Sequence, residues 1–152
     1  MLVNPDAVCQ IGIVVKDIEK AAEHYSEIFG VERPEIFRVP PPEETDIHFR
    51  GEPAATRARI CLFKMSQLLL ELIEPDGEPS SWKEFLDTNG EGVHHIGFLQ
   101  KDRDHYDSAI EYFEKNGMPV RHTGLRPGGS YAYMESARQM GVILNLKYKD
   151  EE

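Results

Sequence analysis

Cysteine is scarce in this 152-residue sequence, and long apolar runs are missing. The two cysteines, Cys9 and Cys61, stand in apolar, strand-like runs, so we expect reduced thiols of a cytoplasmic protein rather than a disulfide between them. No run of about 18 apolar residues occurs, which excludes a membrane-spanning helix. The N-terminal residues MLVNPDAVCQ lack the basic region and apolar stretch of a secretory signal, which also favours the cytoplasm.

Basic residues are also in the minority. The sequence holds 17 Lys and Arg against 27 Asp and Glu, for a net charge of −10. This surplus argues against nucleic acid and anionic membrane surfaces as partners, because both would repel it. A small anionic substrate is not excluded, but it needs local cations. The candidates are Arg57, Arg59, Arg121 and Arg126, although exposed arginines often serve solubility alone.

The sequence does contain an internal repeat. The stretch DAVCQIGIVV (6–15) is echoed by GEGVHHIGF (90–98), and the alignment continues beyond both. The matched pairs are Ile11 and Ile96, Gly12 and Gly97, Asp17 and Asp102, then after a two-residue slip Tyr25 and Tyr112, Gly30 and Gly117. Such ordered self-similarity indicates a duplicated structural unit.

Each copy predicts a strand, a helix and three further strands. Residues 8–15 are apolar and β-branched, which predicts a buried strand. Asp17 is the expected cap of a helix whose apolar positions recur at helical spacing, and Gly30 ends it. The later strands are predicted at 35–39, 56–64 and 68–75 in the first copy and at 119–123, 130–136 and 141–148 in the second.

The predicted fold is therefore α+β, with two tandem βαβββ modules that form a curved mixed sheet around one cavity. We expect a single domain over 1–152, with modules at about 7–75 and 93–148 joined by a short helical connector at 76–92. A capping box of Ser81 and Glu84 starts the connector helix, which we expect to be a structural bridge. Residues 40–55 are predicted to form a long polar loop, and loops of that length are often functional.

Four polar residues stand in strands that should be buried. In LLLELIEP (68–75), alternation puts Glu71 on one face with Leu69 and Ile73, and a carboxylate there needs a partner. Its repeat mate is Asn145, and Gln10 and His95 are mates as well. If the two sheets curl together, these four side chains point into one cavity, either as ligands of Mg, Mn, Co or Zn or as a polar lining without metal. His94 should face away from His95.

These strand patterns, QIGIVVKDIEKA, HHIGFLQKD, LELIEP and ILNL, resemble the vicinal oxygen chelate superfamily, the glyoxalase, bleomycin resistance and dioxygenase group. The resemblance spans residues 8–148, and methylmalonyl-CoA epimerase-like proteins are the most similar. It implies one divalent metal (Co, Mn, Zn or Mg), usually held by His, Glu or Gln, His and Glu. Glu71 and His95 match that set, whereas Gln10 replaces the first His and Asn145 replaces the final Glu. The substitutions predict weak or absent metal binding.

The resemblance implies 1,1-proton transfer on an acyl-CoA or similar oxo-acid, as in an epimerase or lyase, with a homodimer as the common assembly. The third strand of the first module, TRARICLFK, lacks the carboxylate that the epimerases use as a base. Glu71 and Glu135 are the remaining candidate bases. The alternative is a non-catalytic small-molecule-binding protein with a degenerate metal site. A metal-dependent dioxygenase is disfavoured, because it needs two His and a Glu.

Four further residues are candidates for substrate binding: Arg59, Arg126, Tyr131 and Tyr133. The tyrosines either line the pocket or pack in the core. Arg126 opens RPGGSYAY (126–133), which forms either a glycine-rich anion site or simply a β-turn before a strand.

Overall fold

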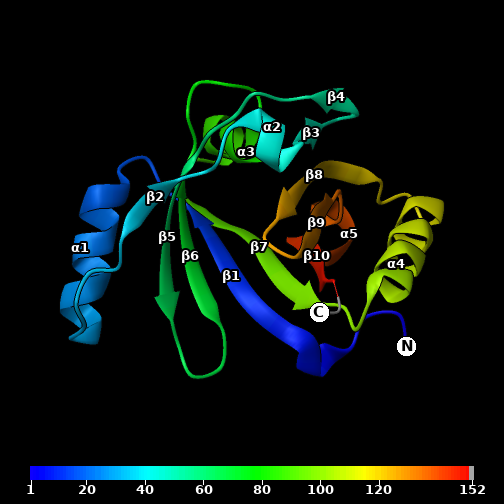
Figure 1. Ribbon diagram of the computed structural model, residues 1–152, viewed down its shortest axis with the longest axis horizontal. Helices are drawn as coiled ribbons and strands as arrows, with labels where there is room; N and C mark the ends of the chain where they lie inside the picture. Colours follow the sequence, from blue (N-terminus) through cyan, green and yellow to red (C-terminus); the bar gives the residue numbers. More distant parts are fainter. Residues whose placement is uncertain (151–152) are drawn as a thin grey trace.

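Two βαβββ modules form one continuous, curled sheet in the computed structural model, which describes residues 1–150 (Figure 1). The first module comprises β1 (Val8–Val14), α1 (Ile18–Phe29), β2 (Ile36–Arg38), β5 (Arg59–Lys64) and β6 (Leu69–Glu74). The second comprises β7 (Gly92–Leu99), α4 (Arg103–Lys115), β8 (Val120–Arg126), β9 (Gly129–Met134) and β10 (Ile143–Lys149). The strand order is β2-β5-β6-β1-β7-β10-β9-β8-β3-β4, so the predicted fold class is confirmed.

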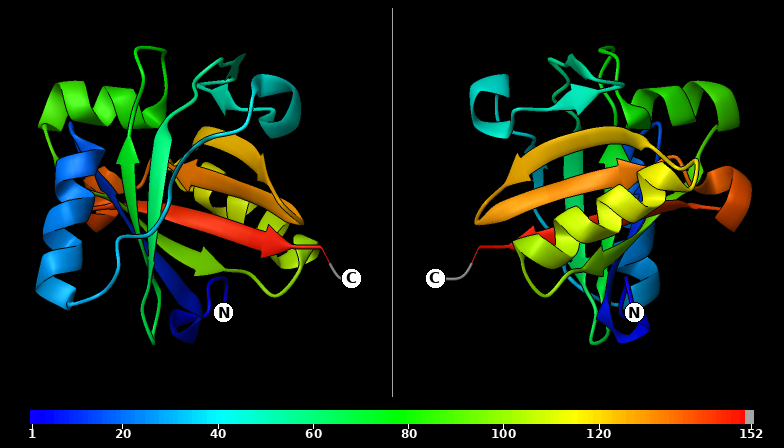
Figure 2. Two further views of the ribbon diagram at one scale, coloured as in Figure 1. Left: turned by 60° about the vertical axis from the view of Figure 1, so that its left-hand side comes forward. Right: turned by 90° about the vertical axis from the view of Figure 1, so that its right-hand side faces the viewer.

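The first strands of the two modules join them. β1 runs antiparallel to β7, with Ile11 opposite Ile96, and each of the two strands pairs in parallel with the last strand of its own module. The two helices lie on opposite outer sides of the curl (Figure 2). The repeat in the sequence is therefore a repeat in space, and its seam runs through the middle of the sheet.

The capping signals operate as predicted. The Asp17 carboxylate accepts a hydrogen bond from the Lys20 N–H at 3.1 Å, and Asp102 does the same for the His105 N–H at 2.9 Å. Gly30 ends α1 in the left-handed region, with φ 65°, where a residue without Cβ is favoured.

Strand alternation separates the core from the inner face of the curl. Leu70 and Leu72 of β6 pack with α1 residues, and Leu144 and Leu146 of β10 pack with α4 residues. The opposite faces of the same two strands hold Glu71 and Asn145. The faces predicted from LLLELIEP are thus the observed ones, because period-2 alternation fixes them.

The segment 40–55 is more ordered than the predicted loop. It contains α2 (Pro42–Thr45) and the short strands β3 (His48–Phe49) and β4 (Glu52–Pro53). β3 pairs with β8, with His48 opposite Thr123, so a first-module insertion extends the second module's edge. Strands of two residues carry no periodicity that a sequence pattern can reveal.

The connector forms α3 (Ser81–Asn89), with one correction. Its N-cap is Ser80, whose hydroxyl accepts from the Lys83 N–H at 3.0 Å, so the Ser81–Glu84 capping box is displaced. Ser81 instead contacts two buried histidines, His94 and His122. The remaining short elements are η1 (Pro5–Ala7) and α5 (Ala137–Met140). Across residues 1–150, no helix has the length and apolar character needed to span a membrane.

Candidate functional site

A cavity of about 540 Å³ lies between the two halves of the curled sheet. Strands from both modules line it, together with Trp82 from α3 and residues near α2. Its apolar wall includes Phe37, Val39, Pro40, Ile60, Leu62, Leu69 and Leu125. Its polar groups come from Gln10, Glu44, Thr45, Glu71, Arg126, Tyr131, Tyr133, Asn145 and Lys147. A few polar groups converging in an apolar hollow are typical of a small-molecule site.

The repeated Ile-Gly dipeptides make room for the site. A Cβ on Gly12 would lie 2.1 Å from Cε1 of His95, and a Cβ on Gly97 would lie 3.0 Å from Cβ of Gln10. Each module's glycine thus accommodates the polar side chain of the other module. Gln10 is 3% exposed and His95 is fully buried, so neither side chain has room to move aside.

A directed chain of hydrogen bonds runs through the histidines. Lys147 Nζ lies 2.5 Å from Gln10 Oε1, and because an ammonium only donates, the amide oxygen must face it. His95 Nε2 lies 3.0 Å from the same oxygen, so this nitrogen carries the proton and donates.

The directions of the other hydrogen bonds follow from the position of this proton on His95 Nε2. Neutral His95 must then accept at Nδ1, and His94 Nδ1 donates to it across 2.8 Å. His94 Nε2 in turn accepts from the Ser81 hydroxyl at 2.9 Å. Burial lowers the pKa of His94 to about 3 and that of His95 well below 6.5, so both rings stay neutral.

The prediction that His94 faces away from His95 is wrong. Gly12 is opposite His95 and Ile13 is opposite Val93, so β7 carries one extra residue at this point. Such a bulge breaks the alternation and turns two consecutive side chains toward the same side. Both rings are fully buried.

Glu71 is an acidic residue that lies beside these hydrogen-bonded histidines. Its Oε1 lies 3.6 Å from His95 Nε2, and its side chain is 15% exposed. Burial raises the pKa of the Glu71 carboxyl, whereas the charges of Lys147 and Arg126 and a hydrogen bond from Gln10 oppose that rise. Two cations near the cavity thus favour the charged form of Glu71, although neither lies within ion-pair distance of it.

Lys147 is the site residue that sequence reasoning missed. It follows Asn145 by two positions on β10, so strand alternation puts both on the inner face. Burial lowers the pKa of its amine, and the Glu71 charge opposes this. The spacing of Asn145 and Lys147 in ILNLK thus already placed the two residues on one face. A lysine is rarely buried, however, so the sequence alone favours a solvated side chain.

Asn145 carries an unpaired oxygen. Its Nδ2 donates to the Ala132 carbonyl at 3.0 Å, but within residues 1–150 its buried Oδ1 has no hydrogen-bond partner. A buried acceptor without a donor is costly, so this oxygen is suited to receive an N–H or O–H from a bound molecule or from water.

The two tyrosines line the cavity and are held from behind. Trp82 Nε1–H donates to the Tyr133 hydroxyl at 3.1 Å. His122 accepts the Ser81 N–H at Nδ1 (3.3 Å), so its Nε2–H donates to the Tyr131 hydroxyl at 3.2 Å. Burial raises the pKa of both phenols well above the ordinary value of 10, which keeps them neutral. The connector is therefore part of the site and not only a bridge.

Two predicted residues lie outside the cavity. Glu135 pairs with Arg121 at 2.8 Å and with Arg50 at 3.0 Å beside the α2–β3 segment. Arg59 pairs with Glu74 at 3.4 Å and with Glu19 on α1. Arg126 does line the cavity, and the residues after it form the turn of the β8–β9 hairpin.

A basic groove adjoins the cavity and shares part of its lining. It has a volume of about 410 Å³ and is lined by Lys64, Arg126, Lys147 and Lys149, among mostly uncharged residues. Gln10, Leu69, Arg126 and Lys147 border both spaces. This concentration of cations stands out on a chain with net charge −10.

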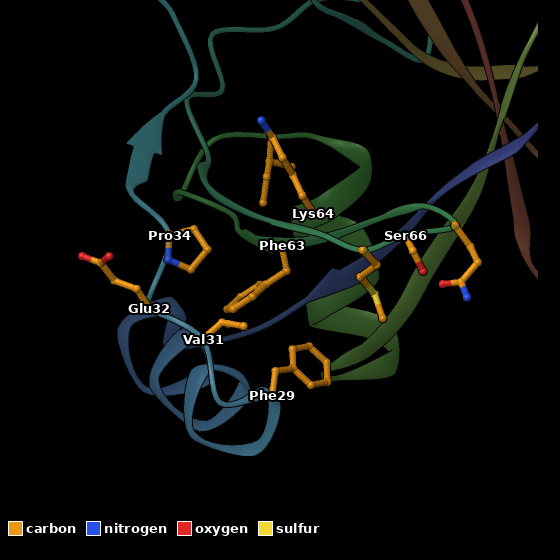
Figure 3. Close-up of a pocket in the computed structure, with 10 residues that line it drawn as sticks. Phe29, Val31, Glu32, Pro34, Phe63, Lys64 and Ser66 are labelled. Carbon is orange, nitrogen blue, oxygen red and sulfur yellow. The ribbon is translucent and has the colours of Figure 1, made fainter.

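A third hollow lies on the outer side, between the end of α1 and the β5–β6 turn (Figure 3). Phe29, Val31, Pro34 and Phe63 form its apolar lining, and Phe29 and Phe63 contact edge to face at 5.9 Å. It brings together no set of polar groups comparable with that around Glu71, so the inner cavity is the stronger candidate site.

The residues present do not fit the divalent metal that the resemblance implies. Gln10 Oε1 already accepts from His95 and from a lysine, and the His95 nitrogen that would coordinate carries a proton. Glu71 and Asn145 Oδ1 are left as donors, too few for a metal that takes four or more ligands. Within residues 1–150, no group of three or more His, Cys, Asp or Glu side chains is placed to hold a metal ion.

Comparison with known proteins matches residues 9–133 to the family model of the Glyoxalase/Bleomycin resistance protein/Dioxygenase superfamily. Similar solved structures include a methylmalonyl-CoA epimerase in complex with methylmalonyl-CoA and NH4+ (24% identity, 94% of each chain covered, TM-score 0.61). An epimerase variant from Streptomyces coelicolor in complex with 2-nitronate-propionyl-CoA is also similar (24%, 95% of this chain and 98% of that chain, TM-score 0.62). The epimerase from Mycobacterium tuberculosis is 18% identical (99% and 91% covered, TM-score 0.63). No curated protein sequence matches the chain.

Proposed function

Because this chain belongs to the Glyoxalase/Bleomycin resistance protein/Dioxygenase superfamily, we propose that it is an enzyme that moves the α-proton of an acyl-CoA or related oxo-acid. The observation that carries the proposal is the placement of Glu71. It is a largely buried carboxylate on the wall of an apolar cavity, with the cations Lys147 and Arg126 lining the same space. A base and an electrophile that share one cavity are the two groups that enolisation requires.

In the proposed step, the Glu71 carboxylate takes the α-proton, and the electron pair of the broken C–H bond delocalises to the carbonyl oxygen. The enolate oxygen is then held by N–H and O–H donors, of which Lys147 and Tyr131 line the cavity. While it sits on the Glu71 carboxyl, this proton exchanges with solvent, so its return to carbon regenerates the substrate with a hydrogen that comes from solvent. Epimerisation needs, in addition, a proton donor on the opposite face of the enolate.

The basic groove supports an acyl-CoA over a free oxo-acid. A CoA thioester carries phosphates far from its acyl group, and Lys64 and Lys149 supply charge outside the cavity. Two of the epimerases similar in structure were solved with CoA thioester ligands, methylmalonyl-CoA and 2-nitronate-propionyl-CoA, the first of them with NH4+ as well.

The test is exchange of the α-proton of methylmalonyl-CoA in deuterated buffer, followed by NMR. We expect exchange by the wild type and a loss of about 10²-fold or more in Glu71→Gln, because general-base catalysis is removed. Glu135→Gln is the matched control, since this carboxylate lies outside the cavity, and it should exchange at the wild-type rate. Absence of exchange by the wild type, or full exchange by Glu71→Gln, would refute the proposal.

A second candidate is a binding protein without catalysis. Strand β5 carries no carboxylate, and Asn145 cannot transfer a proton where the superfamily often has a glutamate. This version predicts that methylmalonyl-CoA raises the melting temperature of the protein without any α-proton exchange. Measuring both quantities on one sample separates the two candidates.

A further inference from the structure

The cavity already contains a cation at the place where the resemblance puts a metal. Gln10, Glu71, His95 and Asn145 are the four positions of the expected ligand set, and Lys147 Nζ reaches into that set to donate to Gln10 Oε1. No carboxylate within residues 1–150 forms an ion pair with this lysine at 4.0 Å or less, whereas other basic side chains such as Lys83 and Arg121 are paired. Its contact in the cavity is a neutral amide oxygen.

The histidine chain also directs a proton, not a lone pair, toward this place. Each bond from Ser81 through His94 to His95 points the same way, so His95 presents Nε2–H to Gln10. The reverse orientation would turn the Gln10 amide N–H groups toward the Lys147 ammonium, so that a donor would face a donor in a buried place. A coordinating histidine needs the opposite arrangement, with its lone pair toward the metal.

The charges that line the cavity also argue against a divalent metal ion. The acidic residues that line the cavity are Glu71 and the exposed Glu44, and the basic ones are Arg126 and Lys147. These charges balance, so an added divalent ion would leave the site strongly positive and close to an ammonium. An anionic ligand, in contrast, is attracted by Lys147 and Arg126 and can receive their N–H groups.

We propose that the Lys147 side chain replaces the divalent metal of the superfamily, and that this cavity binds the carboxylate or carbonyl oxygens of its ligand through Lys147 without a metal ion. Gln10 acts as a positioning residue, because its oxygen accepts from both His95 and Lys147 and so fixes the amine against the inner wall. The inference rests on the proposed function only for the choice of cavity; it concerns binding and holds whether or not a proton is transferred.

The probe is malonate, a small dicarboxylate, titrated by calorimetry into protein treated with EDTA. We expect binding that is unchanged by EDTA, weakened about tenfold or more in Lys147→Met, and partly kept in Lys147→Arg, since a charge-assisted bond is lost or displaced. Lys115→Met is the control, because this lysine is exposed on α4, and it should bind malonate normally. Melting temperatures confirm that each variant is folded.

Mn, Co, Zn and Mg are titrated separately into the wild type, and we expect no saturable binding at metal concentrations up to ~1 mM. Stoichiometric metal binding, malonate binding that needs added metal, full binding by Lys147→Met, or no malonate binding by the wild type would each overturn the inference. If malonate binds through Lys147 and no proton is exchanged, the proposed catalysis fails and this inference stands.

Discussion

At the residue scale, two glycines explain why the repeat is visible in the sequence. Gly12 lies under the His95 ring, and Gly97 lies beside Gln10, where a Cβ would come within 3.3 Å of Asn145 Oδ1. In both copies, the glycine of the Ile-Gly dipeptide is needed because a polar side chain of the other module packs directly against it. Lys147 has no such marker, and its role emerges only when the strand face and the Gln10 contact are known.

Gly12→Ala should destabilise the protein by about 1–3 kcal/mol, because the new methyl group would overlap a buried ring. Gly77→Ala is the control, since no atom lies within 4 Å of a Cβ there and Gly77 is not among the glycines with positive φ; its effect should stay within about 0.5 kcal/mol. Urea unfolding of both variants measures the difference. Equal stability of the two variants would contradict the packing described for His95.

At the scale of elements, α3 and the strands beneath it enclose three neutral histidines. His94 and His122 contact Ser81, and the ring of His122 lies 4.7 Å from that of Trp82. Each ring is held between a helix and a sheet that both exclude water. Burial thus keeps the rings uncharged, and a protonated ring would have to leave this layer or disrupt it.

This layer predicts a stability that falls in acid. Burial lowers the pKa of His94 and His122 to about 3, whereas unfolded histidine titrates near 6.5. Between these values the unfolded chain binds more protons, so stability is fully present above about pH 6.5 and declines as the pH falls below it. Each ring contributes at most ~1.4 kcal/mol per pH unit.

Replacing His122 by Gln removes one of these groups, so the dependence of unfolding free energy on pH should become shallower between about pH 7 and pH 5. Urea titrations across that range measure the slope. His24→Gln, at an exposed position on α1, should leave the slope as it is in the wild type. An identical slope in His122→Gln and the wild type would show that the ring is not held neutral.

The elements were predictable where periodicity or capping is strong. The α1 cap, the alternation of LLLELIEP and the repeat offset all follow from local rules that the surrounding structure did not override. The β3–β4 hairpin and the β7 bulge were not predictable, because two-residue strands carry no period and a bulge depends on the partner strand. The error on His94 follows directly from that bulge.

At the scale of the whole molecule, charge is distributed unevenly. The chain carries a net charge of −10, yet Lys64, Arg126, Lys147 and Lys149 gather along one groove. The sequence predicted that any anionic substrate would need local cations, and Arg126 was among the candidates. The three lysines of the groove were not, because residues from distant strands come together there only in the folded protein.

The affinity for methylmalonyl-CoA should therefore depend on salt. Binding should weaken several-fold between about 0.05 and 0.5 M NaCl, because exposed charges are screened. The double variant Lys64→Gln with Lys149→Gln should bind more weakly at low salt and show a smaller salt dependence. Lys115→Gln, at an exposed position on α4 outside the groove, should behave as the wild type does. Salt-independent binding would mean that the groove does not hold the phosphates.

The central claim is that this chain performs α-proton chemistry with its own side chains in a cavity without metal. The most direct measurement is deuterium exchange into methylmalonyl-CoA by one preparation before and after exhaustive treatment with EDTA. The account predicts the same exchange rate in both samples and its loss in Glu71→Gln. Exchange that disappears with EDTA and returns on addition of Mn, Co, Zn or Mg would contradict it.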